Sequence, residues 1–220
     1  MSFIPLTAAR FDAVRDTQKV FRVLLDALSR PGKLHELPPV GFVFGSARTR
    51  SSAFEQFQAL GAVLVTLLDH EVTFCLLSQD GQDDVTHDLS IQLGNLTASH
   101  AVPRDKANYV VTLQAPASSL LSQLNPGNLL YPDTSATLIC LVPELAARSL
   151  SEHTGTLLAL DGPGVAERQT VWVADTNATF FNALSTVNAQ YPLGFDVIWV
   201  TPAGRVAGLP RSSQLTIVEG

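Results

Sequence analysis

The sequence predicts an α/β fold: a single three-layer domain over residues 1–220, with a mixed sheet and helices on both faces. Apolar runs of strand length alternate along the chain with segments in which apolar residues recur at helical spacing. The chain then closes with two apolar strands, 195–200 and 205–209, on either side of the turn Thr201-Pro202-Ala203-Gly204. Proline in second place and glycine in fourth place favour a type I turn, so the second strand returns antiparallel. Residues 195–200 are largely apolar on both faces, which places this strand inside the sheet.

The composition is that of a globular protein, and it narrows the choice of partners. Hydrophobic residues make up 46% of the chain, charged residues 15%, and the formal net charge is -6. A negatively charged chain is a poor match for nucleic acid or an anionic membrane surface, so neither is expected. No signal-peptide pattern and no apolar run of roughly 18 residues is visible, which favours a cytoplasmic location. The mean hydropathy of +0.20 predicts exposed apolar patches, and therefore a homodimer.

Two amphipathic helices are expected before the first strand. The first is capped by Asp16 and stopped by Pro31-Gly32. A loop-rich stretch follows, and the second helix begins at a capping box, Ser52 to Glu55, and leads into a strand over 72–77. The inward positions of the first helix are Val20 or Phe21, Leu24 or Leu25, and Leu28.

A short helix capped by Asp80 is expected next. It points Val85, Leu89 and Leu93 inward. Asp83 and His87 stand four residues apart on its other face and could share a metal. Acidic residues are favoured at a helix N-terminus for electrostatic reasons alone, so a solvated face is the preferred interpretation.

The second half of the chain is expected to supply further strands and two helices. The last helix is capped by Asn177 or Asp175 and buries Phe180, Phe181, Leu184 and Val187. Pro210 interrupts the ladder after the hairpin, because proline has no N–H to donate. The remaining elements are a strand over 109–113, a short helix over 117–124, strands over 136–142 and 156–160, and a last strand over 215–218.

The hairpin register suggests one specific contact. If Val200 opposes Arg205, then Asp196 opposes Leu209, and Arg211 is the diagonal neighbour of Asp196 on the same face. A carboxylate in an apolar strand needs a partner, so a structural ion pair is the preferred interpretation. The alternative is that the Arg211 guanidinium is free to bind an anion.

The common catalytic and metal-binding motifs are not found in the sequence. It contains no phosphate-binding Gly-x-x-x-x-Gly-Lys-Ser/Thr loop, no Gly-x-Ser-x-Gly elbow, no His-Glu-x-x-His and no Cys-x-x-Cys. Cys75 and Cys140 lie in apolar runs and are expected to be buried and unreactive. The five histidines, His35, His70, His87, His100 and His153, are scattered, and structural or surface roles are expected.

The segment Gly162-Pro163-Gly164 follows an expected strand and could cradle a phosphate through its backbone N–H groups. Glu167 stands where a dinucleotide fingerprint requires glycine or alanine. A plain turn is therefore the preferred interpretation.

Several short motifs along the chain match the pattern of one family. They are FRVLLDALSRPG at 21–32, YPDTSATL at 131–138, DGPGV at 161–165, Asn188, YPLGFD at 191–196 and LPRSS at 209–213. Together they resemble the PhnH family of phosphonate metabolism, whose members are subunits of the bacterial carbon-phosphorus lyase core complex. The match fails at 90–93, where the family shows Arg-Phe-His-Thr and this chain has Ser-Ile-Gln-Leu. The resemblance implies structural, ligand or partner contacts, and no catalytic or metal-binding role, at Arg22, Pro31, Gly32, Gly162, Gly164, Asn188, Gly194, Asp196, Pro210 and Arg211.

The resemblance implies a function and a fold. The function is that of a non-catalytic subunit that works with the other subunits of the core complex, which forms ribose 1-phosphonate 5-triphosphate from ATP and an alkylphosphonate. The fold is similar to that of pyridoxal-phosphate-dependent transferases, but no cofactor is expected. The three lysines, Lys19, Lys33 and Lys106, all lack the apolar setting that a Schiff-base lysine requires.

Two rival interpretations stay open. One is a stand-alone phosphate-ester or nucleotide transferase that uses Asp196 and Arg211. The other is a vestigial pyridoxal-binding protein, which would show Schiff-base absorbance. Turnover by the isolated chain, or its absence until other subunits are added, separates the enzyme from the complex subunit.

Overall fold

The structure is a computed structural model that describes residues 11–39, 56–78, 83–150 and 154–218. The side chains of residues 83–85 are outside this description. The capping box Ser52 to Glu55, the cap Asp80 and His153 also lie outside the described residues, as does the side chain of Asp83.

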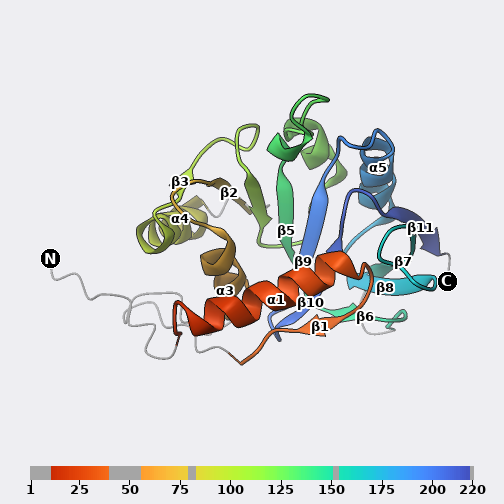
Figure 1. Cartoon of the computed structure of the whole chain (residues 1–220), viewed down its shortest axis with the longest axis horizontal. Helices are drawn as coiled ribbons and strands as arrows, with labels where there is room; N and C mark the ends of the chain where they lie inside the picture. The colour runs from red at the N-terminus through yellow and green to blue at the C-terminus, as the bar shows by residue number, and fades with distance from the viewer. Residues whose placement is uncertain (1–10, 40–55, 79–82, 151–153, 219–220) are drawn as a thin grey trace, which may run out of the picture.

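A seven-stranded mixed sheet forms the centre of the molecule (Figure 1). Its strand order is β1-β10-β9-β5-β4-β2-β3, and the five strands from β9 to β3 are parallel. β10 and β1 extend one edge in antiparallel pairing. The mixed sheet that the sequence predicts is therefore confirmed. Its strands are β1 (His35–Glu36), β2 (Thr73–Leu77), β3 (His100–Ala101), β4 (Tyr109–Thr112), β5 (Thr137–Leu141), β9 (Asp196–Val200) and β10 (Arg205–Leu209).

A second sheet, which the sequence analysis does not anticipate, packs against the first. It is antiparallel throughout, with the order β11-β7-β8-β6. The expectation of one sheet is wrong because alternation of apolar residues shows that a segment is a strand but not which strand pairs with it. The strands are β6 (Leu145–Ala146), β7 (Gly155–Asp161), β8 (Gln169–Ala174) and β11 (Gln214–Val218).

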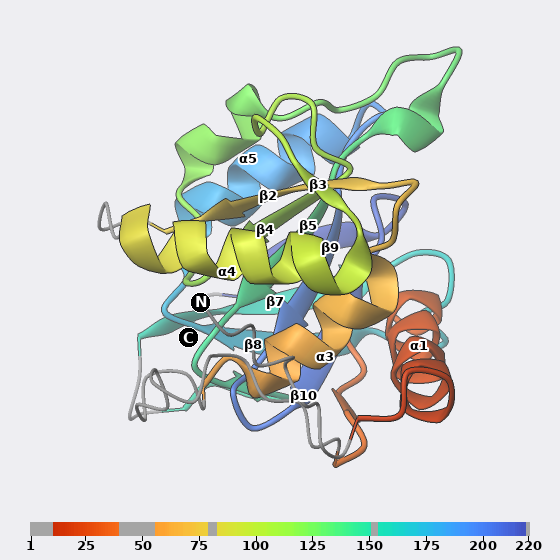
Figure 2. The same ribbon diagram turned by 90° about the vertical axis from the view of Figure 1, so that its left-hand side faces the viewer.

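Helices cover both faces of the main sheet, as expected. One face carries α1 (Arg15–Ser29), α3 (Gln58–Leu67) and α4 (Asp83–Thr97) (Figure 2). The other face carries α5 (Ala178–Asn188), the 3₁₀ turn η1 (Ser118–Gln123) and the second sheet. A second 3₁₀ turn, η2 (Pro132–Thr134), precedes β5.

The predicted N-terminal caps of α1 and α5 can be compared with the hydrogen bonds in the structure. Asn177 caps α5, since its side chain accepts a hydrogen bond from the Phe180 N–H at 3.0 Å. The prediction of Asp16 as the cap of α1 is wrong. Asp12 accepts from the N–H groups of Val14 and Arg15, each at 2.9 Å, while Asp16 lies in the first turn.

The core alternates across the central strands. In β9, Val197 and Trp199 pack toward α5 and the second sheet, while Ile198 and Val200 pack toward α1 and α3. All four side chains are buried. α1 crosses β10 closely at Gly208, where a Cβ would lie 2.7 Å from the Ala27 carbonyl oxygen. The prediction that both faces of β9 are covered is confirmed.

The register of the terminal hairpin differs by one residue from the predicted one. Val200 pairs with Val206 and Leu209 with Val197, so Leu209 faces α5 and the second sheet. The loop is one residue shorter than expected because Thr201 pairs with Arg205: the Thr201 N–H donates to the Arg205 carbonyl at 2.9 Å. Gly204, with φ of +86°, supplies the left-handed residue that a three-residue loop requires.

The two cysteines differ in burial. Cys140 is fully buried in β5, and burial raises the pKa of its thiol to about 12. Cys75 in β2 is only half-buried, so the expectation that both are buried is wrong for Cys75. Burial also raises the pKa of the Cys75 thiol, although the positive charge of Arg104 lowers it in part.

We predict that native protein reacts with thiol reagents slowly at Cys75 and not measurably at Cys140. At pH 8 a thiol with a pKa near 12 is only about 10⁻⁴ ionised, and the thiolate is the reactive form. Mass spectrometry after timed labelling, with and without denaturant, measures both rates. Rapid labelling of Cys140 in folded protein contradicts the prediction.

Candidate functional site

The predicted contact between Asp196 and Arg211 is confirmed. The Arg211 Nε and Nη2 atoms donate to Asp196 Oδ2 at 3.1 and 2.5 Å, and the Arg211 backbone N–H donates to Oδ1 at 2.8 Å. The Arg211 Nη1 donates to the carbonyl of Pro132 at 2.8 Å. The two side chains are 15% and 25% exposed. Arg211 reaches Asp196 from the turn after β10, and not as its diagonal neighbour in the sheet.

This geometry favours the structural interpretation of the pair. Three donor atoms of the guanidinium are engaged within the protein, and the charge of Asp196 compensates that of Arg211. An arginine held in this way has little capacity left for a ligand anion. The Arg211 backbone N–H also donates to the Asp196 carboxylate, a contact that the sequence analysis does not predict.

Asn188 and Gly194 support the same region. The Asn188 Oδ1 accepts from the Phe195 N–H at 2.8 Å, and its Nδ2 donates to the Phe195 carbonyl at 3.1 Å. Gly194 has φ of +123°, and a Cβ there would collide with Asn188 Oδ1. Its N–H donates to the Pro126 carbonyl at 3.0 Å. The hydrogen bonds between Asn188 and Phe195, with the close approach of Gly194 to Asn188, therefore fix the backbone just before β9 begins.

The glycine-rich turn at 162–164 packs against two distant segments. A Cβ on Gly164 would collide with the Ser29 carbonyl oxygen, and one on Gly162 would lie 3.3 Å from the Ser212 carbonyl oxygen. Pro31 and Gly32 are buried beside this turn. Because protein backbone occupies the surroundings of the turn, the plain-turn interpretation is supported over phosphate binding.

Nine of the ten residues singled out by the resemblance thus belong to linked segments, which we call the signature belt: residues 29–32, 162–164, 188–196 and 210–212. Arg22 is the exception, since it is exposed on the outer side of α1. Close packing between the segments of the signature belt accounts for the residues found in each of its motifs. No group of three metal-ligating side chains occurs among the described residues.

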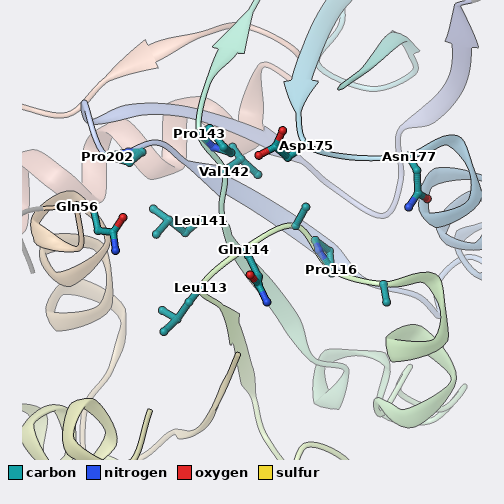
Figure 3. A pocket seen from close by; sticks show the side chains of 12 residues that line it. Gln56, Leu113, Gln114, Pro116, Leu141, Val142, Pro143, Asp175, Asn177 and Pro202 are labelled. Atoms are coloured by element: carbon teal, nitrogen blue, oxygen red, sulfur yellow. The ribbon is translucent and has the colours of Figure 1, made fainter. Parts of the chain in front are cut away.

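The sequence analysis missed a cavity at the carboxyl ends of the parallel strands (Figure 3). It measures about 470 Å³, and ligands of open α/β sheets usually bind at this edge. The lining consists of residues 113–117 after β4, residues 141–143 at the end of β5, Pro202 after β9, and Gln56, Asp175 and Asn177. A smaller cavity of about 150 Å³ adjoins it, shares residues 114–117 and contains Arg104.

The polar groups of the larger cavity are three carboxamides and one carboxylate. Gln114 Nε2 is buried without a hydrogen-bond partner. Asn177 uses its Oδ1 as the cap of α5, and Asp175 is exposed with φ of +56°. Among the lining residues that the structure describes, none is a lysine or an arginine. The cavity is therefore polar and carries negative charge.

Several residues that line this cavity stand at positions in the sequence that could have drawn attention to them. Gln114-Ala115-Pro116 and Thr201-Pro202 directly follow apolar strands, and Asp175 precedes a helix. Sequence alone explains each of them as a turn or a cap, because only the strand order shows that these segments meet at one edge.

Comparison with known proteins places the chain among proteins of phosphonate metabolism. The model of a family described as "Bacterial phosphonate metabolism protein (PhnH)" matches residues 9–216. A relative from Rhizobium meliloti (strain 1021), "Alpha-D-ribose 1-methylphosphonate 5-triphosphate synthase subunit PhnH", is 25% identical over 205 residues, covering 93% of this chain and 92% of the relative. A second, "Putative C-P lyase subunit protein HtxG" from Stutzerimonas stutzeri, is 28% identical over 202 residues, covering 91% and 86%.

We predict that Asp196→Ala and Arg211→Ala each lower the free energy of unfolding by roughly 2 to 4 kcal/mol, because each leaves a half-buried charge unpaired. The double variant should recover part of the summed loss, as measured by denaturant unfolding in a double-mutant cycle. The exposed pair Asp26 and Arg30, 2.9 Å apart, is the control and should show coupling below about 0.5 kcal/mol. Strictly additive losses at 196 and 211 contradict the structural pair.

Proposed function

This chain belongs to the PhnH family of bacterial phosphonate metabolism proteins, and on that premise we propose that it is a non-catalytic subunit of the carbon-phosphorus lyase core complex. In that role it supports the formation of ribose 1-phosphonate 5-triphosphate from ATP and an alkylphosphonate. The observation that carries the proposal is the match along nearly the whole chain to a relative named as a subunit of the corresponding synthase. The second relative, named as a putative carbon-phosphorus lyase subunit, supports it independently.

The site geometry favours a complex subunit over a stand-alone enzyme. The rival transferase depends on Asp196 and Arg211, and these residues bind each other and the Pro132 carbonyl. All three lysines lie within the described ranges, and none of them lines the cavity at the sheet edge. The similarity to the fold of pyridoxal-phosphate-dependent transferases, the cytoplasmic location and the lack of a nucleic-acid partner stay predictions.

Among the described helices, none has the length and apolar character needed to cross a membrane.

The loop before β5 carries one candidate surface for partner subunits, which we call the tip patch: Leu129, Leu130 and Tyr131. The loop projects from the body of the molecule (Figure 2). Leu129 is 75% and Leu130 84% exposed. The Asn128 Oδ1 accepts from the N–H groups of Leu130 and Tyr131, at 3.0 and 2.9 Å, which orders the tip before binding. Ordered, exposed apolar side chains of this kind are typical of protein interfaces.

A second candidate surface lies on α1 and the residue before it, and we call it the helix stripe: Val14, Phe21 and Leu25. Phe21 is 49% and Leu25 58% exposed. The spacings of seven and four residues place the three side chains along one side of the helix, as in helices that pair with a copy of themselves. We assign the tip patch to partner subunits and the helix stripe to a second copy of this chain.

We predict that the isolated chain has no turnover with ATP and an alkylphosphonate, and that activity requires the remaining subunits. Adding the chain to a preparation of the complex that lacks its PhnH-family component should restore product, measured by ³¹P NMR. The Leu129→Ser/Leu130→Ser variant should restore at least tenfold less product at limiting concentration, while Phe21→Ser/Leu25→Ser restores complex formation. Turnover by the single chain contradicts the proposal.

We further predict that the chain is a dimer at micromolar concentration. Burial of the helix stripe at a two-fold axis removes apolar surface from water and supplies the driving force. Sedimentation velocity should give a dimer for the wild type and for Leu129→Ser/Leu130→Ser, and a monomer for Phe21→Ser/Leu25→Ser. A monomeric wild-type protein at this concentration contradicts the proposed dimer.

A further inference from the structure

The cavity at the carboxyl edge of the main sheet is lined by three carboxamide side chains, and one of them has a buried donor without a partner among the described residues. Gln114 lies near its centre, and Gln56 and Asn177 lie on opposite sides (Figure 3). Gln114 Nε2 is buried and has no partner among the described residues. A buried donor without a partner costs free energy, and a ligand or water that accepts from it would offset that cost. The volume of about 470 Å³ lies within the range of roughly 300 to 1,000 Å³ that is usual for small-molecule sites.

The charge of the cavity argues against a phosphate or phosphonate group inside it. Asp175 supplies a carboxylate, and the described residues that line this cavity include no lysine or arginine. Arg104 belongs to the smaller neighbouring cavity and donates to Gln123 Oε1 at 2.9 Å. Within the described lining, an anion would meet the negative charge of Asp175 and no cationic side chain. The preferred ligand is therefore neutral.

The carboxamides and the carboxylate that line the cavity indicate which class of neutral ligand fits it. A carboxamide presents a donor and an acceptor side by side, the arrangement that pairs with the edge of a purine base. A carboxylate accepts hydrogen bonds from the hydroxyl groups of a ribose. Leu113, Leu141 and Pro143 supply apolar wall on which the flat faces of a base can pack.

We propose that this cavity binds a ribonucleoside, with the Gln114 carboxamide at the base and the Asp175 carboxylate at the ribose hydroxyls. The binding is a property of the isolated chain, so it goes beyond the proposed function and does not depend on it. The ligand would also supply an acceptor for the Gln114 amide donor, which has none among the described residues.

Calorimetric titration of the isolated chain with adenosine tests the proposal, with ribose and ATP titrated separately. Saturable binding of adenosine is expected, with ribose at least tenfold weaker and ATP no tighter than adenosine. The titration with ATP tests whether the site recognises the nucleoside or an anion. Tighter binding of ATP identifies an anion site and overturns the proposal, and equal binding of ribose overturns the assignment of the base. No saturable heat with adenosine at several millimolar also overturns it.

Two variants locate the binding. Gln114→Leu removes the unpaired donor and should weaken adenosine binding about tenfold without loss of thermal stability. Asp175→Asn removes the charge, and asparagine tolerates the left-handed backbone at this position, so the fold is kept while adenosine binding falls about tenfold. Gln190→Leu, at an exposed glutamine outside the cavity, is the matched control and should bind as the wild type does. Unchanged affinity in both cavity variants overturns the proposal, and it leaves the complex-subunit function to its own test.

Discussion

The carboxylate of Asp196 joins segments that lie far apart in the chain. It accepts the backbone N–H and the guanidinium of Arg211, whose remaining contact reaches the carbonyl of Pro132, just before β5. A largely buried carboxylate requires such compensation, because the cost of removing it from water is several kcal/mol. Arg211 starts the turn that leads to β11, so this ion pair lies where the chain leaves the main sheet and enters the second. The ion pair therefore fixes the path of the chain between the two sheets, which pack against each other through a shared apolar core.

The two ends of the parallel strands differ in the residues that they carry. Asp196 and Pro132 lie at the amino ends of β9 and β5, where segments of the signature belt pack closely against one another. A cavity of about 480 Å³ also lies beside the belt, lined by Asn188, Tyr191 and Arg211 among others. The carboxyl ends of β4 and β5, with Pro202 after β9, surround an open cavity into which the described residues leave one buried donor, Gln114 Nε2, without a partner. The motifs that carry the family resemblance lie mostly at the first end.

The exposed apolar residues have a common origin in the local structure. Phe21 and Leu25 take the outer side of α1 because Val20 and Leu24 already fill the inner side against the sheet. Leu129 and Leu130 are held outward by the Asn128 side chain, which accepts from the N–H groups of Leu130 and Tyr131. In neither place can the side chains turn into the core without losing these local contacts. Both surfaces are therefore available for association without rearrangement of the fold.

The sequence by itself determined the α/β class, most helices and strands, the two-sided burial of β9 and the contact between Asp196 and Arg211. These follow from short-range periodicity, turn chemistry and the need of a buried charge for a partner. Only the tertiary structure decided the second sheet, the hairpin register and the cavity. Pairing between β7, β8 and β11 joins segments whose alternation suits many partners, and the register depended on Gly204 adopting a left-handed conformation. Gln114, Asp175 and Asn177 come together only because the strand order brings distant loops to one edge, and no local pattern in the sequence contains that order.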